Sequence, residues 1–227
     1  MKLILLIFLS TCTFAKTIRI AIAEDVYYFA PAYIEILKAI YKEVGLTVQL
    51  TVLPQQRALK EFNDGKFQAM AARIKDVTYV SERAIPLETP VIENFKYGLL
   101  ALKNSPQSRL EKFDINKYKV LKVRGTVMGD IFESKYQLKH VSLAKSINNA
   151  IELLKRNRAD FLIGSVVFNR SKEVSDNLHF MKDYQEMSSA NHIIAPELLY
   201  LKPQIEEVFV RYKAEGKLHP SKLIKKD

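Results

Sequence analysis

The feature that most constrains the fold of this 227-residue chain is a regular alternation of strand and helix signals. Two early segments alternate polar and apolar residues, as half-buried strands do, and a third is short and apolar. Between them lie two amphipathic segments, the first ended by Gly45 and the second opened by Pro54. The predicted strands are residues 17–23, 46–53 and 67–72, and the predicted helices are residues 31–44 and 54–63. This order predicts a parallel sheet covered by helices.

A second unit of the same kind follows along the chain. Apolar runs again alternate with segments in which apolar residues recur at helical spacing. The predicted strands are residues 97–102, 119–123 and 159–163, and the predicted helices are residues 126–136, 143–157 and 203–214. The pattern therefore indicates an α/β protein with two lobes and a closing C-terminal helix.

The first fifteen residues have the three-part build of a secretory signal peptide. Lys2 supplies a positive charge, Leu3–Leu9 is an apolar run too short to span a bilayer, and small residues surround a possible cleavage site after Ala15. Residues 9–12 also resemble a lipoprotein box, in which Cys12 would carry a lipid. The prediction is an exported, periplasmic chain cleaved after Ala15, with lipidation at Cys12 as the alternative.

Cys12 is the only cysteine, so a chain cleaved after Ala15 has no disulfide, thiolate nucleophile or cysteine-based metal site. The four histidines are scattered without metal-ligand spacing, and no cofactor-binding motif is present. The net charge of +10 comes from basic residues spread along the chain, which is typical of a solvated basic surface. We therefore expect no metal, no cofactor and no nucleic-acid partner.

Three passages carry a resemblance to a known family. They are LPQQRALKEFNDGKFQAMAAR at residues 53–73, VRGT at residues 123–126 and SINNAIELLKRNRADFLI at residues 146–163. In their order and spacing they resemble the type II periplasmic solute-binding proteins of family 3, which are best known for binding amino acids for ABC importers. The resemblance covers nearly all of the chain after the signal peptide.

The resemblance implies the two-lobed periplasmic-binding-protein fold, with parallel-rich sheets, helices on both faces and a two-strand hinge. Lobe 1 would comprise residues 16–95 and 191–227, and lobe 2 residues 96–190. A solute held in the cleft between the lobes favours the closed state by its contacts to both. A monomer is the expected state.

In amino-acid binders of this family, an arginine of lobe 1 binds the carboxylate of the ligand. Arginine suits this task because its planar donors match a carboxylate and stay charged. Here Arg73, at the end of the third predicted strand, is the preferred candidate, and Arg83 is the second. A surface ion pair is the alternative for Arg73. For Arg57, in the first turn of its predicted helix, an ion pair or a helix cap is the preferred interpretation.

The second lobe departs from the family pattern. The aspartate that holds the ammonium group would fall at Ser165, and serine carries no negative charge. This departure favours an anionic or neutral solute over an ordinary amino acid. Asp160, just before it, is expected to cap or pack near the start of its strand.

The remaining candidates for the cleft are a turn and two aromatic residues. Gly125 and Thr126 open a helix whose free amide groups can bind an anion, although Thr126 can equally act as a plain N-cap. Tyr27 and Tyr28, after the first strand, resemble family aromatics that stack on ligands, and they can equally belong to the core.

The function expected from the resemblance is capture of a small polar, anionic solute for the permease of an ABC importer. The first alternative is a sensor that presents its solute to a signalling membrane protein. The second is an enzyme on the same fold, similar to periplasmic dehydratases, with Glu24 and Asp25 as the best-placed acids. The binding role is preferred because no histidine or carboxylate is paired with a nucleophile.

Overall fold

The computed structural model describes residues 16–165 and 177–223. The predicted signal peptide and Cys12 lie outside the described residues, so cleavage and lipidation both stay predictions. In the described part of the chain, no helix is both long enough and apolar enough to cross a membrane.

Eight strands form one sheet in the order β2-β1-β3-β8-β4-β7-β5-β6. β1 pairs in parallel with β2 and β3, and β5 pairs in parallel with β6 and β7. The four central strands pair antiparallel. The strands are β1 Lys16–Ala23, β2 Leu46–Leu53, β3 Ala69–Ile74, β4 Ile85–Leu102, β5 Val120–Val123, β6 Val141–Ala144, β7 Phe161–Gly164 and β8 Leu178–Ile194. An antiparallel centre joins the two parallel groups into one sheet.

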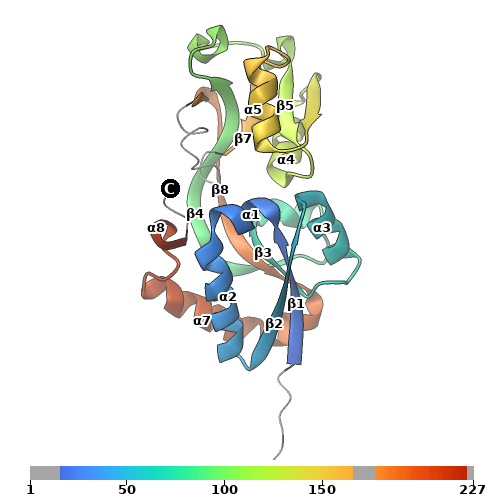
Figure 1. The fold of residues 1–227 in the computed structure, drawn as a ribbon, viewed down its shortest axis with the longest axis vertical. Helices are drawn as coiled ribbons and strands as arrows, with labels where there is room; N and C mark the ends of the chain where they lie inside the picture. Colours follow the sequence, from blue (N-terminus) through green and yellow to red (C-terminus); the bar gives the residue numbers. More distant parts are fainter. Residues whose placement is uncertain (1–15, 166–176, 224–227) are drawn as a thin grey trace, which may run out of the picture.

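Helices flank this sheet in two groups, which Figure 1 shows one above the other. The first group surrounds β1–β3 (lobe 1), and the second surrounds β5–β7 (lobe 2). The α-helices are α1 Glu24–Phe29, α2 Pro31–Glu43, α3 Gln55–Asn63, α4 Val127–Tyr136, α5 Ile147–Lys155, α7 Lys202–Ala214 and α8 Pro220–Leu223. Short 3-10 helices are η1 Lys75–Tyr79, η2 Pro106–Arg109, η3 Ile115–Lys117 and η4 Pro196–Leu201. The mixed α/β fold with two lobes is confirmed.

The long strands β4 and β8 run side by side between the lobes (Figure 1). Their register shifts at several points, including near Pro86 and Pro90, because proline cannot donate to a strand ladder. At Gly98 the strands come so close that an added Cβ would lie 2.1 Å from the Tyr184 carbonyl oxygen. The lobe boundaries predicted at residues 95/96 and 190/191 fall within these two strands and stay predictions.

A fully buried histidine lies in the core of lobe 1. His192 on β8 is hydrogen-bonded to Tyr41 Oη at 2.7 Å through Nε2, and its ring stacks on Phe209. Tyr33 Oη lies 3.5 Å from its other ring nitrogen. Burial lowers the pKa of His192 to about 3, so the ring is neutral at physiological pH. The ring therefore has a structural role in this core.

Two regions differ from the sequence-based elements. The helix predicted from residue 143 begins only at Ile147, because residues 141–144 pair with β5 as the edge strand β6. Ser146 then caps the helix by accepting the amide N–H of Asn149 at 3.2 Å. The local pattern did not predict the strand β8, since its middle is polar and its pairing partners lie far away in the sequence. Only the family resemblance implied a hinge strand near residue 190.

Candidate functional site

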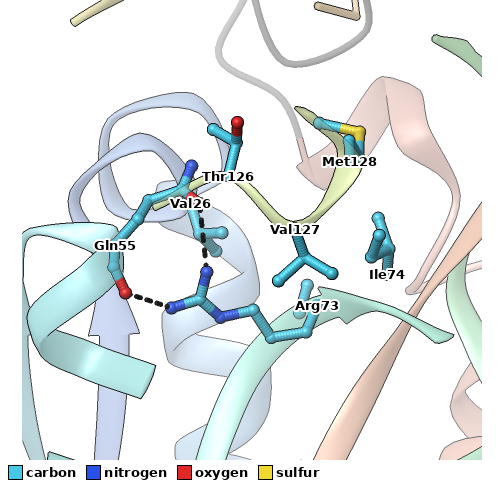
Figure 2. A pocket seen from close by; sticks show the side chains of 8 residues that line it. Val26, Gln55, Arg73, Ile74, Thr126, Val127 and Met128 are labelled. Atoms are coloured by element: carbon cyan, nitrogen blue, oxygen red, sulfur yellow. Dashed lines mark hydrogen bonds between the residues drawn. The ribbon is translucent and has the colours of Figure 1, made fainter. Parts of the chain in front are cut away.

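A small pocket lies where the two lobes meet, and Figure 2 shows its wall. Its volume is about 30 Å³, which holds on the order of two water molecules. Lobe 1 supplies residues from α1, α3 and β3, and lobe 2 supplies the first turn of α4. The described lining residues are Val26, Gln55, Ala72, Arg73, Ile74, Thr126, Val127 and Met128. The lobes therefore approach closely here, and a larger solute requires them to part.

Arg73 is the only ionisable side chain among these lining residues. It projects from β3, whose six residues are all buried, and is itself only 8% exposed. Its Nη1 donates to Gln55 Oε1 and its Nη2 donates to the Gln55 carbonyl oxygen, both at 3.2 Å (Figure 2). A guanidinium held in this way is a fixed positive charge at the floor of the pocket.

The structure places the other candidate arginine, Arg83, away from the pocket. Its guanidinium donates to both carboxylate oxygens of Glu197 and to the Phe62 carbonyl oxygen, beyond the far end of α3. Arg57 forms the surface ion pair expected for it, with Glu61 one turn along α3 at 2.7 Å. Of the arginines considered from the sequence, Arg73 is thus the one at the pocket.

The start of α4 forms the wall opposite Arg73. Gly125 adopts φ +77°, a left-handed conformation that favours glycine. The Thr126 hydroxyl donates back to the Val123 carbonyl oxygen at 2.8 Å, so it does not cap the helix. Within the described residues no side chain caps this end, and the amides of Val127 and Met128 stay available for an anion.

Aromatic packing and an ion-pair cluster hold α4 in place. Phe132 is fully buried and packs between Tyr97 of β4 and Tyr136, with ring centroids 6.5 and 4.4 Å away. On another side, Lys122 of β5 pairs with Asp130 at 2.5 Å and with Glu133. The helix is therefore fixed to lobe 2, and its amino end can move relative to Arg73 only with the lobe.

The lobes touch directly beside the pocket. A Cβ added at Gly125 would lie 2.6 Å from the Cβ and 2.7 Å from the backbone nitrogen of Gln56. Gln56 lies in the first turn of α3, so the amino ends of α3 and α4 meet at this point. Each amino end carries a partial positive charge, and Arg73 adds a full one. The junction is electropositive and favours an anion between the lobes.

Two other predicted site residues, Ser165 and Tyr27, are not among the described residues that line the pocket. Ser165 is buried, and its hydroxyl donates to the Lys96 carbonyl oxygen of β4 at 2.7 Å. Tyr27 is 43% exposed and does not line the pocket. The side chain of Tyr28 lies outside what the structure describes. Asp160 has the structural role expected for it, accepting from the Lys119 amide and from Gln107.

Gln55 and Met128 line the pocket but were not predicted to do so. A signal for both is present in the sequence, because each lies within two residues of a predicted helix start that follows a predicted strand. The carboxyl ends of parallel strands are where open α/β sheets bind ligands. In the described part of the chain, no cluster of histidine, cysteine or acidic residues could hold a metal.

The sequence matches no protein-family model and no curated protein sequence. Its fold, however, is found in many solved structures. One is an ABC uptake transporter substrate-binding protein from Streptococcus pneumoniae with bound histidine, with a TM-score of 0.72 and 16% identity, covering 92% of this chain and 95% of that one. Another is the AvGluR1 ligand-binding domain in complex with phenylalanine, with a TM-score of 0.75 and 12% identity, covering 94% and 96%.

A third similar structure is the ancestral amino-acid-binding protein AncCDT-1, a precursor of cyclohexadienyl dehydratase. Its TM-score is 0.71 at 14% identity, covering 92% of this chain and 96% of that one. At these identities the comparisons establish the fold. The chain has the fold of the type II periplasmic binding proteins, as the sequence motifs indicated.

Proposed function

We propose that this protein is an extracytoplasmic receptor that captures a small anionic solute between its lobes and delivers it to an ABC-type importer. The observation that carries the proposal is the meeting of Arg73 with the uncapped amino end of α4 across the pocket. Both groups attract negative charge, and each belongs to a different lobe. A carboxylate between them would link the lobes and favour the closed state.

The chemistry of the wall supports an anion over a zwitterion. Among the described lining residues no carboxylate is present to hold an ammonium group, and Ser165 is committed to Lys96. The rest of the wall is mostly apolar, with Val26, Ile74 and Val127. A small carboxylate with a short apolar tail fits this composition best.

The residues that line the pocket also favour binding over catalysis. General acid–base chemistry needs a group that titrates near the working pH, and the described lining offers only a guanidinium. The similarity to a dehydratase precursor concerns the fold. Incubating the protein with small carboxylates and following them by NMR tests this choice: a binding protein leaves the solute unchanged, whereas conversion would show an enzyme.

Thermal-shift screening followed by calorimetry tests the receptor function. We expect small carboxylates to stabilise the protein by mass action and amino acids to do so less. Arg73→Gln should weaken binding at least about 30-fold, because removing one partner of a desolvated charge pair costs about 2 kcal/mol or more. The matched control is Arg57→Gln, an arginine of the same region with an exposed ion pair. Selective binding of zwitterionic amino acids, or full affinity in Arg73→Gln, would refute the anion receptor.

Uptake measurements separate the importer from the sensor. If the protein serves an importer, a strain lacking it should lose high-affinity uptake of the solute found by the screen. Unchanged uptake with a lost transcriptional or motility response would instead favour a signalling partner.

A further inference from the structure

Two hydrogen bonds join the terminal nitrogens of Arg73 to the neighbouring residue Gln55. Two acceptors of this residue, the side-chain Oε1 and the main-chain oxygen, each lie 3.2 Å from one Nη atom of the guanidinium. Figure 2 shows one contact on each of the two terminal nitrogens. Two oxygens facing the two Nη atoms is also the arrangement in which a carboxylate binds arginine end-on.

The two contacts have different consequences for a solute. The main-chain oxygen is fixed by α3 and keeps its place whatever the side chain does. It can therefore hold Arg73 in position by itself through Nη2. The side-chain amide is only partly buried and can rotate, so the Nη1 contact is the one that can be exchanged.

We propose that the Gln55 side chain is an internal ligand of Arg73, which occupies the solute's place on Nη1 and is displaced when a carboxylate binds. The proposal rests on the function proposed above and refines the solute class. A carboxylate oxygen carries a negative charge and therefore binds a guanidinium more strongly than a neutral amide oxygen does. A carboxylate can therefore displace Gln55, whereas a neutral amide gains nothing by the exchange.

Gln55 would thus act as a specificity residue that admits anions and rejects neutral solutes of the same shape. The limited space supports this view, since the pocket holds on the order of two water molecules in the arrangement seen.

Acetate and acetamide form a matched pair of probes, being an anion and its neutral analogue. Calorimetric or NMR titration of the wild-type protein should show binding of acetate and at least about tenfold weaker binding of acetamide. Gln55→Ala should bind acetate about tenfold more tightly and should begin to bind acetamide, because a hydrogen bond to a charged group no longer has to be exchanged. Gln55→Glu should lose acetate binding, because its carboxylate pairs permanently with Arg73.

Gln56→Ala, one residue along, is the control: it keeps the Cβ that faces Gly125 and should leave both affinities unchanged. Unchanged or weaker acetate binding in Gln55→Ala, while Arg73→Gln abolishes it, would overturn the internal-ligand role and leave the receptor intact. If neither the wild-type protein nor any variant binds acetate, or if Arg73→Gln still binds it, the proposed anion site itself is refuted.

Discussion

Gly125 allows the sharpest test of the contact between the lobes. In Gly125→Ala, the new Cβ would lie 2.6 Å from Gln56 Cβ and 2.9 Å from its Cα, well inside ordinary contact distance. A left-handed φ of +77° adds roughly 1–2 kcal/mol of backbone strain. The strain is local, but the overlap lies between two lobes and can be relieved when they move apart. The variant should therefore fold and stay open.

Gly45→Ala is the matched control for this variant. Gly45 also has φ +77°, but nothing lies within 4 Å of its added Cβ. Both variants should lose roughly 1–2 kcal/mol of unfolding free energy in urea. Only Gly125→Ala should increase the radius of gyration in solution X-ray scattering and weaken solute binding. Equal scattering for wild type and Gly125→Ala, or an equal loss of binding in Gly45→Ala, would refute the reasoning.

Three further predictions concern stability. Burial lowers the pKa of His192 to about 3, so between about pH 6.5 and pH 3 only the unfolded chain gains a proton at this ring. The free energy of unfolding should therefore fall by about 1.4 kcal/mol per pH unit in this range. His192→Phe should remove this part of the slope in urea unfolding at pH 7 and 5; an unchanged slope would contradict the buried neutral ring. In Gly98→Ala the new Cβ would lie 2.1 Å from the Tyr184 carbonyl oxygen, so the free energy of unfolding should fall by about 3 kcal/mol or more. A fall of less than about 1 kcal/mol would show that β4 and β8 can separate at this point. Asp160→Ala removes the acceptor of two hydrogen bonds and should lower the free energy of unfolding by about 1.5–3 kcal/mol relative to wild type. Thermal unfolding measures this difference, and an unchanged stability would show that the two hydrogen bonds are weak.

Local patterns were sufficient for much of the fold. Residues 46–53 alternate polar and apolar side chains and form β2 over that full length, since the side-chain period of a strand is a local property. The helix at Pro31 and the one ended by Gly216 also begin and end close to their predicted residues. Period and terminator residues are readable without knowing what the segment packs against.

Elements that depend on distant partners were not predictable in this way. The polar stretch in β8 is a strand because β4, some 90 residues earlier, pairs along it. Leu143 was assigned to a helix, but it is half-exposed in the edge strand β6, where pairing with β5 decides its conformation. Pairing between distant segments overrides local propensity in such places.

The candidate site shows the same division. The sequence singled out Arg73, Gly125 and Thr126, which lie at or beside the pocket, because strand ends and helix starts are local features. It preferred Arg73 but kept Arg83 as a second candidate, since the partner of Arg83 is Glu197, far along the chain. Nor could the sequence show that the Gln55 side chain accepts a hydrogen bond from Arg73, because that contact depends on how α3 lies against β3.

The most direct test of the anion site is a crystal structure of the protein with the small carboxylate that stabilises it most. We expect the carboxylate between Arg73 Nη1 and the first amides of α4, with the Gln55 side chain turned away. A carboxylate bound elsewhere, with the Arg73–Gln55 contact intact, would contradict it.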